Sequence, residues 1–245
     1  MPEHPPTVVL VHGAFAESAS WARVGELLQA RSLQVLAAAN PLRSLAGDAR
    51  YVRDVVASVG GPVLLVGHSY GGAVITAAAE DEEAVVGLVY VAGFALQPGE
   101  SALELSGRFP GSTLGDTLQT YPVASGGDEF RIAPDAFHQQ FAADVPAGQA
   151  TVMAVTQRPV TRAALAEPLV ARTAPWNALP SWFVFGDADR NIPVQAHRFM
   201  AERAGAAAVR EVAGASHALA VSQPEVVAAV IAEAAATAGQ VPVPA

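Results

Sequence analysis

The chain has 245 residues, of which 51% are hydrophobic and 15% charged, and its formal net charge is −9. This composition is typical of one well-buried globular domain, and the acidic balance argues against a nucleic-acid partner because no basic stripe compensates for it. All fourteen cationic residues are arginine, and there is no cysteine. The sequence thereby excludes Schiff-base lysines, P-loop lysines, thiolate nucleophiles, disulfides and cysteine-based metal sites.

Apolar segments of strand length alternate with amphipathic segments of helix length along most of the chain. We expect strands at residues 7–12, 34–38, 62–67, 85–92, 181–186 and 208–212, and helices at residues 18–31, 45–58, 72–80, 194–204 and 224–236. Strands that are apolar throughout, with helices between them, are typical of a parallel sheet covered by helices on both faces. The sequence therefore predicts an α/β fold.

Residues 94–179 interrupt this alternation. The stretch is too long for a simple crossover and contains helix-like segments at residues 134–143, 148–156 and 161–170. It begins after the carboxyl end of a strand, on the side where ligands bind in open α/β sheets. We therefore expect a core of residues 1–93 and 180–245 and a helical cap of residues 94–179, inserted before the fifth strand; a merely structural subdomain is the alternative. The substrate-binding residues stay unknown at this point, but the larger apolar side chains of this stretch are candidates for the walls of a site: Phe109, Tyr121, Phe130, Phe137, Phe141 and Met153.

The most informative segment is Gly67-His-Ser-Tyr-Gly71, which follows an apolar strand and precedes a helix rich in small residues. It is a Gly-x-Ser-x-Gly motif in the strand, turn and helix context that a nucleophile elbow requires. Such a turn strains the backbone of the serine, and the flanking glycines let strand and helix pass closely. We therefore predict that Ser69 is a nucleophile whose Oγ stands above the edge of the sheet.

A serine hydroxyl needs a base to attack at neutral pH, and the chain has six histidines. His217 fits this role best, because it follows the small-residue segment Val-Ala-Gly-Ala-Ser after the last strand, and the chain order Ser, Asp, His supports it. His68 must point away from Ser69 across the turn, and His12 ends the first strand. The others are expected in the terminal segment (His4) or as solvated or half-buried imidazoles (His138 and His197).

Two aspartates compete for the role of the acid that orients the base. Both lie in the segment Phe185-Gly-Asp-Ala-Asp-Arg-Asn-Ile-Pro193, at the carboxyl end of the fifth strand. Asp187 directly follows a glycine, where an aspartate commonly bonds the amides of a turn. Asp189 lies farther into the loop, where its carboxylate can meet the imidazole. We prefer Asp189 and keep Asp187 as the alternative.

A developing oxyanion needs N–H donors, and two positions can supply them. The amide of Tyr70 follows the nucleophile at the start of a helix. The second donor is expected after His12-Gly13, at Ala14, in the segment Val9-Leu-Val-His-Gly-Ala.

With these motifs the chain resembles α/β-hydrolase-fold proteins over nearly its whole length, above all the branch of plant methylesterases, hydroxynitrile lyases and their bacterial esterase relatives. The resemblance implies a six-stranded sheet in the order 2-1-3-4-5-6 and an enzyme without a cofactor or metal. It also implies that the acid of the motif Gly-x-x-Asp-x-x-x-Pro is Asp189 and that an oxyanion donor is Ala14.

Residues and resemblance together predict a serine hydrolase that cleaves a carboxylic ester of a small or medium apolar substrate. The alternatives are cleavage of a C–C bond by the same triad and a ligand-binding protein with vestigial esterase activity. The N-terminal residues lack the layout of a signal peptide, and no uncharged apolar stretch reaches ~18 residues. We therefore expect a cytoplasmic protein without a membrane or nucleic-acid partner; a homodimer is left open.

Within the resembling branch, the lyases carry a lysine after the catalytic histidine and a threonine after the first-strand histidine. This chain has Ala218 and Gly13 at those positions and no lysine to stabilise a departing cyanide. An isolated anion is strongly disfavoured in an apolar pocket. We therefore expect hydrolysis of esters and no hydroxynitrile lyase activity.

Overall fold

The computed structural model describes residues 5–124 and 126–238. Within them, the centre is a parallel sheet of six strands: β1 (Thr7–Val11), β2 (Val35–Ala38), β3 (Val63–His68), β4 (Val85–Val91), β8 (Ser181–Gly186) and β9 (Ala208–Val212). The strand order is β2-β1-β3-β4-β8-β9, so the predicted strands and their order are confirmed. Residues 1–4, with His4, and residues 239–245 of the expected core lie outside the described residues.

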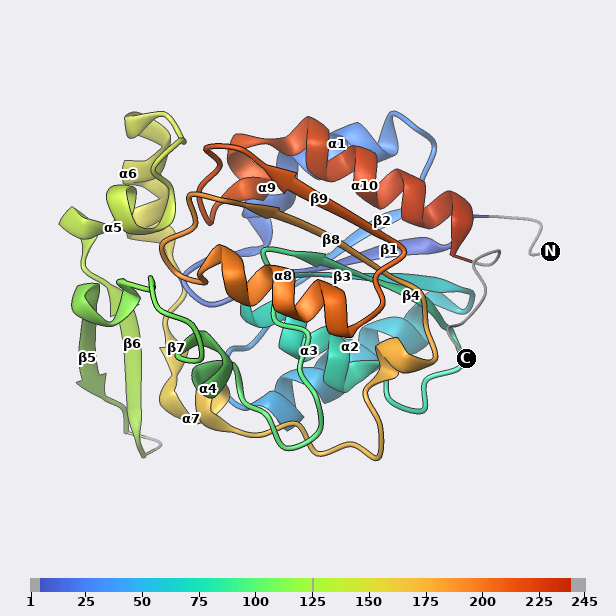
Figure 1. Ribbon diagram of the computed structural model, residues 1–245, viewed down its shortest axis with the longest axis horizontal. Coiled ribbons are helices and arrows are strands. Elements are labelled where there is room, and N and C mark those ends of the chain that lie inside the picture. Colours follow the sequence, from blue (N-terminus) through green and yellow to red (C-terminus); the bar gives the residue numbers. More distant parts are fainter. Residues whose placement is uncertain (1–4, 125, 239–245) are drawn as a thin grey trace.

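Helices cover both faces of this sheet (Figure 1). On one face lie α1 (Ala22–Gln29), which follows the 3-10 turn η1 (Ser18–Trp21), together with α9 (Leu219–Ser222) and α10 (Pro224–Thr237). On the other face lie α2 (Leu45–Val59), α3 (Tyr70–Ala78) and α8 (Val194–Arg203). The two-sided cover explains the apolar strands, because alternate side chains of a strand point to opposite faces. In β3, Leu65 packs on the α2 and α3 side, whereas Leu64 and Val66 pack on the α1 and α10 side.

The insertion between β4 and β8 lies beside one end of the sheet (Figure 1). Its helices are α4 (Ala102–Ser106), α5 (Pro134–Phe141), α6 (Ala147–Thr156) and α7 (Arg162–Ala166), with the 3-10 turns η2 (Leu114–Thr117) and η3 (Pro175–Asn177). The segment predicted as helical at residues 161–170 is shorter, because the residue before Pro168 is disfavoured in a helix.

The insertion also contains an antiparallel sheet that the sequence did not predict. It is formed by β5 (Leu118–Pro122), β6 (Asp128–Ile132) and β7 (Val160–Thr161). Its strands are short and polar, which gives little apolar periodicity. A glycine pair at positive φ, Gly126 and Gly127, lies between β5 and β6 and was the available hairpin signal.

Candidate active site

Ser69 occupies the turn between β3 and α3 in a strained conformation. Its φ is 53° and its ψ is −123°, outside the regions that L-residues favour. The turn is possible because strand and helix touch through glycines: a Cβ on Gly67 would come within 2.5 Å of the Gly71 carbonyl oxygen. The local geometry is thus that of the predicted nucleophile elbow.

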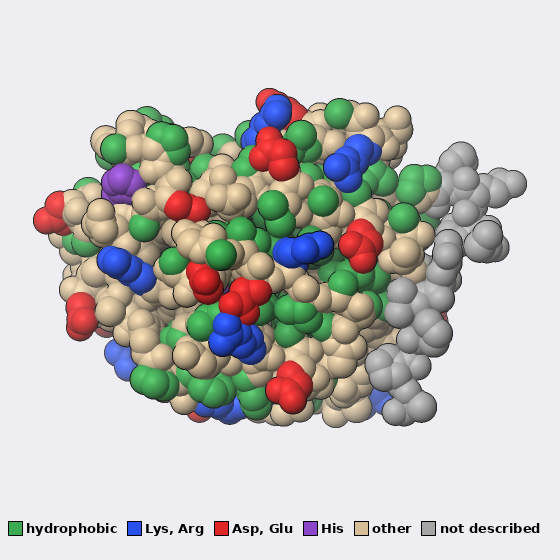
Figure 2. All heavy atoms as spheres, turned by 45° about the horizontal axis from the view of Figure 1, so that its top comes forward, with side chains coloured by type: hydrophobic (Ala, Val, Ile, Leu, Met, Phe, Trp, Pro, Cys, Tyr) green, Lys and Arg blue, Asp and Glu red, His purple; other side chains and the backbone are tan. Residues whose placement is uncertain are grey.

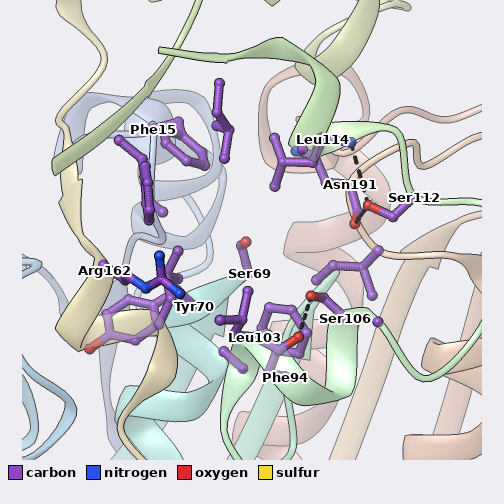
Figure 3. Close-up of a pocket in the computed structure, with 18 residues that line it drawn as sticks. Phe15, Ser69, Tyr70, Phe94, Leu103, Ser106, Ser112, Leu114, Arg162 and Asn191 are labelled. Carbon is purple, nitrogen blue, oxygen red and sulfur yellow. Dashed lines mark hydrogen bonds between the residues drawn. The ribbon is translucent and has the colours of Figure 1, made fainter. Parts of the chain in front are cut away.

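The Ser69 side chain points into a cavity of about 380 Å³ (Figure 3). Ser69 is only 7% exposed, and its Oγ has no hydrogen-bond partner among residues 5–124 and 126–238. The walls come from the core loop after β1 and from the insertion. They are mainly apolar, and their larger members include Phe15, Phe94, Leu103, Leu114, Phe130 and Leu165.

His217 and Asp189 form a buried pair. The distance from His217 Nδ1 to Asp189 Oδ2 is 2.6 Å, and both side chains are almost completely inaccessible. The other carboxylate oxygen accepts the backbone amides of Asn191 and Ile192 at 2.7 and 3.0 Å. Burial alone would raise the pKa of Asp189, but the nearby His217 and the bonds to the carboxylate outweigh it and hold this pKa below its usual value. Asp189 is therefore an anion that can orient the imidazole.

His217 also lies next to the elbow. His68 is the residue before Ser69. The centroids of the His68 and His217 rings are 4.8 Å apart, and His68 Nε2 is 3.0 Å from the His217 carbonyl oxygen. Phe141 packs edge-on against the His217 ring. Among the described residues, no hydrogen bond joins Ser69 Oγ to His217. Catalytic hydrogen bonds of this kind often form fully only when substrate is bound.

Asp187 lies in a different environment from Asp189. It is exposed, and its Oδ1 accepts the amide of Gly214 at 2.6 Å. Asp187 thus bonds a backbone amide, as expected, but the amide belongs to the turn after β9 and not to its own turn. The structure does not bring Asp187 to His217.

One histidine expectation was wrong. His197 is not solvated or half-buried: its side chain is inaccessible, and its Nε2 lies 3.3 Å from the same Asp189 oxygen that His217 bonds. Burial lowers the pKa of His197. The helical spacing of the sequence could have indicated this burial. His197 lies on the buried stripe of α8 that Ala196, Met200 and Ala201 form.

The two expected oxyanion donors flank Ser69. Ala14 and Tyr70 both line the cavity and are buried. Neither of their amides donates a hydrogen bond to another described residue, so both N–H groups are available. The Tyr70 ring points away from Ser69 (Figure 3) and its hydroxyl donates to Asp48 Oδ2 at 2.9 Å, which ties the start of α3 to α2.

The loop that carries Ala14 is fixed against the elbow. Asn40 Nδ2 donates to the His12 carbonyl oxygen at 2.8 Å. A Cβ on Gly13 would come within 2.6 Å of Ser69 Cβ and within 3.0 Å of the Tyr70 amide nitrogen. Gly13 is therefore required for the close approach of this loop to the nucleophile. A threonine there would collide with the serine itself.

The expected cavity walls were mostly wrong. Of the six candidates only Phe130 lines the cavity. Phe137 and Phe141 stack on each other in the core, and Phe109 packs against Phe199. The two remaining side chains contact other places: Met153 lines a separate small cavity, and the Tyr121 hydroxyl donates to Glu129.

In the described part of the chain, no group of three or more His, Asp or Glu side chains is arranged to hold a metal ion. In the same residues, every helix is too short or too polar to cross a bilayer.

The geometry has counterparts among known proteins. The sequence profile described as "Alpha/beta hydrolase family" matches residues 8–230. No curated protein matches the sequence. Among solved structures, polyneuridine aldehyde esterase is similar with a TM-score of 0.80 at 21% identity, covering 94% of this chain and 99% of the other.

Two further solved structures share the fold. A pyrethroid hydrolase from Sphingobium faniae has a TM-score of 0.75 at 23% identity, over 96% of this chain and 99% of the other. A tomato methylketone synthase I variant, complexed with beta-ketoheptanoate, has a TM-score of 0.79 at 18% identity, over 97% and 100%. At such identities the similarity shows the fold.

Proposed function

Because the chain belongs to the alpha/beta hydrolase family, we propose that it cleaves a carboxylic ester of a small or medium, largely apolar molecule by way of an acyl-enzyme. Ser69 is the nucleophile, His217 the base and Asp189 the acid of the triad. The amides of Ala14 and Tyr70 form the oxyanion hole.

The reaction has two halves with the same proton movements. Ser69 Oγ attacks the ester carbonyl carbon while its proton passes to His217 Nε2, and the carbonyl oxygen becomes an oxyanion held by the two amides. The tetrahedral intermediate collapses, and the alcohol leaves with the proton from His217. Water then attacks the acyl-enzyme by the same steps and releases the acid.

The observation that carries this proposal is the buried 2.6 Å pair of His217 and Asp189 beside the strained elbow of Ser69. A solvated ion pair on a surface would lend no such support, because its geometry is not fixed. The apolar cavity above Ser69 supports an apolar acyl or alcohol group in the substrate.

The proposal is tested by pre-steady-state hydrolysis of p-nitrophenyl butyrate. We expect a burst of p-nitrophenol of about one equivalent per active site, if deacylation is slower than acylation. Acid quenching followed by peptide mass spectrometry should find a butyryl group on the peptide that contains Ser69. A chain that releases no p-nitrophenol, or that is acylated only elsewhere, would refute the proposal.

A further inference from the structure

Arg162 is an isolated charge in the wall of the cavity. Of the described residues that line the cavity, it is the only one with a charged side chain. Leu165, Phe130 and Phe15, which line the same cavity, are apolar. Arg162 also lines a second cavity, together with Arg43 and Asp128. Figure 3 shows its guanidinium on the same side of the cavity as Tyr70, directed toward the space that Ser69 faces.

The Arg162 guanidinium has no ion-pair or hydrogen-bond partner among residues 5–124 and 126–238. Some other arginines of the insertion and its surroundings are paired, namely Arg43 with Glu129, and Arg108 and Arg203 with Glu100. Arg131 bonds only the neutral Gln119. Arginines are also interspersed with acidic side chains on the face seen in Figure 2. A cation that lines an apolar cavity without a carboxylate from its own chain is a candidate for an anion of the ligand.

The backbone that carries Arg162 is anchored to the core. The Thr161 amide donates to the Leu42 carbonyl oxygen at 3.1 Å, and the Thr161 hydroxyl lies 2.6 Å from the Arg43 carbonyl oxygen. The same hydroxyl oxygen accepts the Ala164 amide at 3.1 Å and so caps α7. The start of α7 thus has a fixed position relative to the loop after β2, although it belongs to the insertion.

We infer that Arg162 binds a carboxylate of the substrate, so that the preferred substrates are esters with a free carboxylate at the end remote from the scissile bond. This inference rests on the proposed function and specifies its substrate class. A guanidinium pairs with a carboxylate through two parallel hydrogen bonds, and the apolar surroundings strengthen them. Because Arg162 is also accessible to solvent, the expected gain is moderate, on the order of tenfold in affinity.

The test compares monomethyl adipate with its neutral isostere, the methyl ester of adipamic acid. The measured quantity is the ratio of kcat/KM for the anionic ester to kcat/KM for the neutral ester. Arg162→Gln should lower this ratio about tenfold. Arg31→Gln is the matched control, because it removes the same charge from an exposed residue that lines none of the cavities described above. This substitution should leave the ratio unchanged. An unchanged ratio in Arg162→Gln would overturn the inference.

A binding experiment separates this inference from the proposed function. Calorimetry measures monomethyl adipate binding to Ser69→Ala and to the double variant Ser69→Ala/Arg162→Gln. If the native chain hydrolyses neither ester, the proposed function fails, but weaker binding by the double variant still supports a carboxylate at Arg162. Equal binding by the two variants rejects it.

A second, independent observation concerns His197. Two imidazoles, His217 and His197, share Asp189 Oδ2, while two amides occupy Oδ1. The His197 ring stacks on Phe185 with 4.9 Å between centroids. Its Nδ1 is buried without a partner among the described residues, so the ring proton is assigned to Nε2, facing the carboxylate.

We propose that His197 is a positioning residue that holds Asp189 Oδ2 opposite His217. A neutral N–H donor takes up part of the carboxylate charge without adding a positive charge, so Asp189 stays ionised and its attraction for a protonated His217 is moderated. The other titratable groups that interact electrostatically with these residues are His68 at the end of β3, which acts on His217 and Asp189, and Glu211 on β9, which acts on His197.

The test uses two variants and the pH dependence of kcat/KM. His197→Phe keeps a ring against Phe185 but loses the donor, and should lower kcat about tenfold with little change in KM. Its acid limb should move to higher pH, because the freed carboxylate stabilises protonated His217 more strongly. His197→Gln retains a donor, so both the fall in kcat and the shift of the acid limb should be smaller in this variant.

A purely structural role would lower the melting temperature of His197→Phe without moving the acid limb or separating kcat from KM. That outcome would overturn the positioning role. A native chain without ester turnover would instead refute the proposed function.

Discussion

The buried histidine and aspartate cluster of the core differs from the insertion side of the cavity in how its side chains are held. In the cluster, the side chains of Asp189, His217 and His197 are inaccessible to solvent, and each bonds a partner within the cluster. On the insertion side, Leu103 lines the cavity yet is 46% exposed, and Arg162 has no side-chain partner among the described residues. The comparison supports the proposal that the core fixes the geometry of the reaction, whereas the insertion can differ in which substrates it admits. Substitutions on the two sides should therefore differ in kind as well as in size.

The largest effect is expected for Ser69→Ala. Without the nucleophile no acyl-enzyme forms, so kcat for p-nitrophenyl butyrate should fall by at least roughly 10⁴-fold with an unchanged circular dichroism spectrum. Ser106→Ala is the control on the insertion side, since Ser106 lines the same cavity and bonds only the Leu103 carbonyl oxygen. It should retain nearly native kcat. Similar losses in both variants would contradict the comparison.

The next effect separates the two aspartates. Asp189→Asn should lower kcat roughly 10³-fold with little change in KM, because the imidazole loses its oriented tautomer. Asp187→Asn should keep kcat and lower the melting temperature slightly, through the Gly214 amide. If Asp187→Asn abolishes turnover instead, the two roles must be exchanged.

Acid should destabilise the folded chain through two buried histidines, His12 and His68. Burial lowers the pKa of His12 to about 4, and burial with the nearby His217 lowers that of His68 to about 3. Below about pH 6.5 the unfolded chain protonates these rings while the folded chain does not. Between pH 6.5 and 4 each ring should therefore remove roughly 1.4 kcal/mol of unfolding free energy per pH unit.

Urea denaturation at pH 7, 6 and 5 measures this effect. His12→Asn should reduce the slope of the unfolding free energy against pH by the amount that corresponds to about one proton, and it should lower the stability at pH 7. A stability that does not change between pH 7 and 5 would show that these rings are not buried in their neutral form.

A smaller effect is expected at the insertion side. Leu103→Ala should change the unfolding free energy by less than about 1 kcal/mol, because the side chain is half exposed. It should alter the order of KM values across a series of p-nitrophenyl esters of increasing acyl length, with kcat for the shortest ester retained. An unchanged order would show that Leu103 does not contact the acyl group.

No effect at all is expected with cyanohydrins. Ala218 is buried, and its amide donates to the Phe141 carbonyl oxygen, so the position after His217 offers no cation. Cyanide release from mandelonitrile should equal the buffer rate. Release that depends on Ser69 and matches ester turnover would show that an arginine replaces the missing lysine.

The parts of the molecule that the sequence predicted are those in which local pattern and global fold agree. Continuous apolar strands implied the two-sided sheet, and the glycines around Ser69 implied the elbow. The spacing of Asp187 and Asp189 implied their different surroundings. In each case the signal lies within one short segment of the sequence.

The parts that the sequence missed depend on contacts between distant segments. The short polar strands β5 and β6 form only by pairing with each other and with β7. The walls were misassigned because Phe137 and Phe141 have the same apolar character whether they face a cavity or the core. His197 meets Asp189 only because α8 packs back on the loop that precedes it, which a residue type alone does not reveal.

The place of the insertion in the sheet has a consequence for recombination. The chain leaves β4 and returns in β8, and these strands are hydrogen-bonded neighbours, with Leu88 opposite Ser181. Because the two strands are parallel, the insertion leaves at the carboxyl end of β4 and returns at the amino end of β8, and the core holds both ends in place. Lengthening a loop between fixed ends costs only about 0.6 kcal/mol per doubling. Chimaeras that exchange this segment between relatives would leave the strands and the buried histidine and aspartate cluster in place. Such grafts offer a direct experimental route to new ester preferences with an unchanged set of proposed catalytic residues.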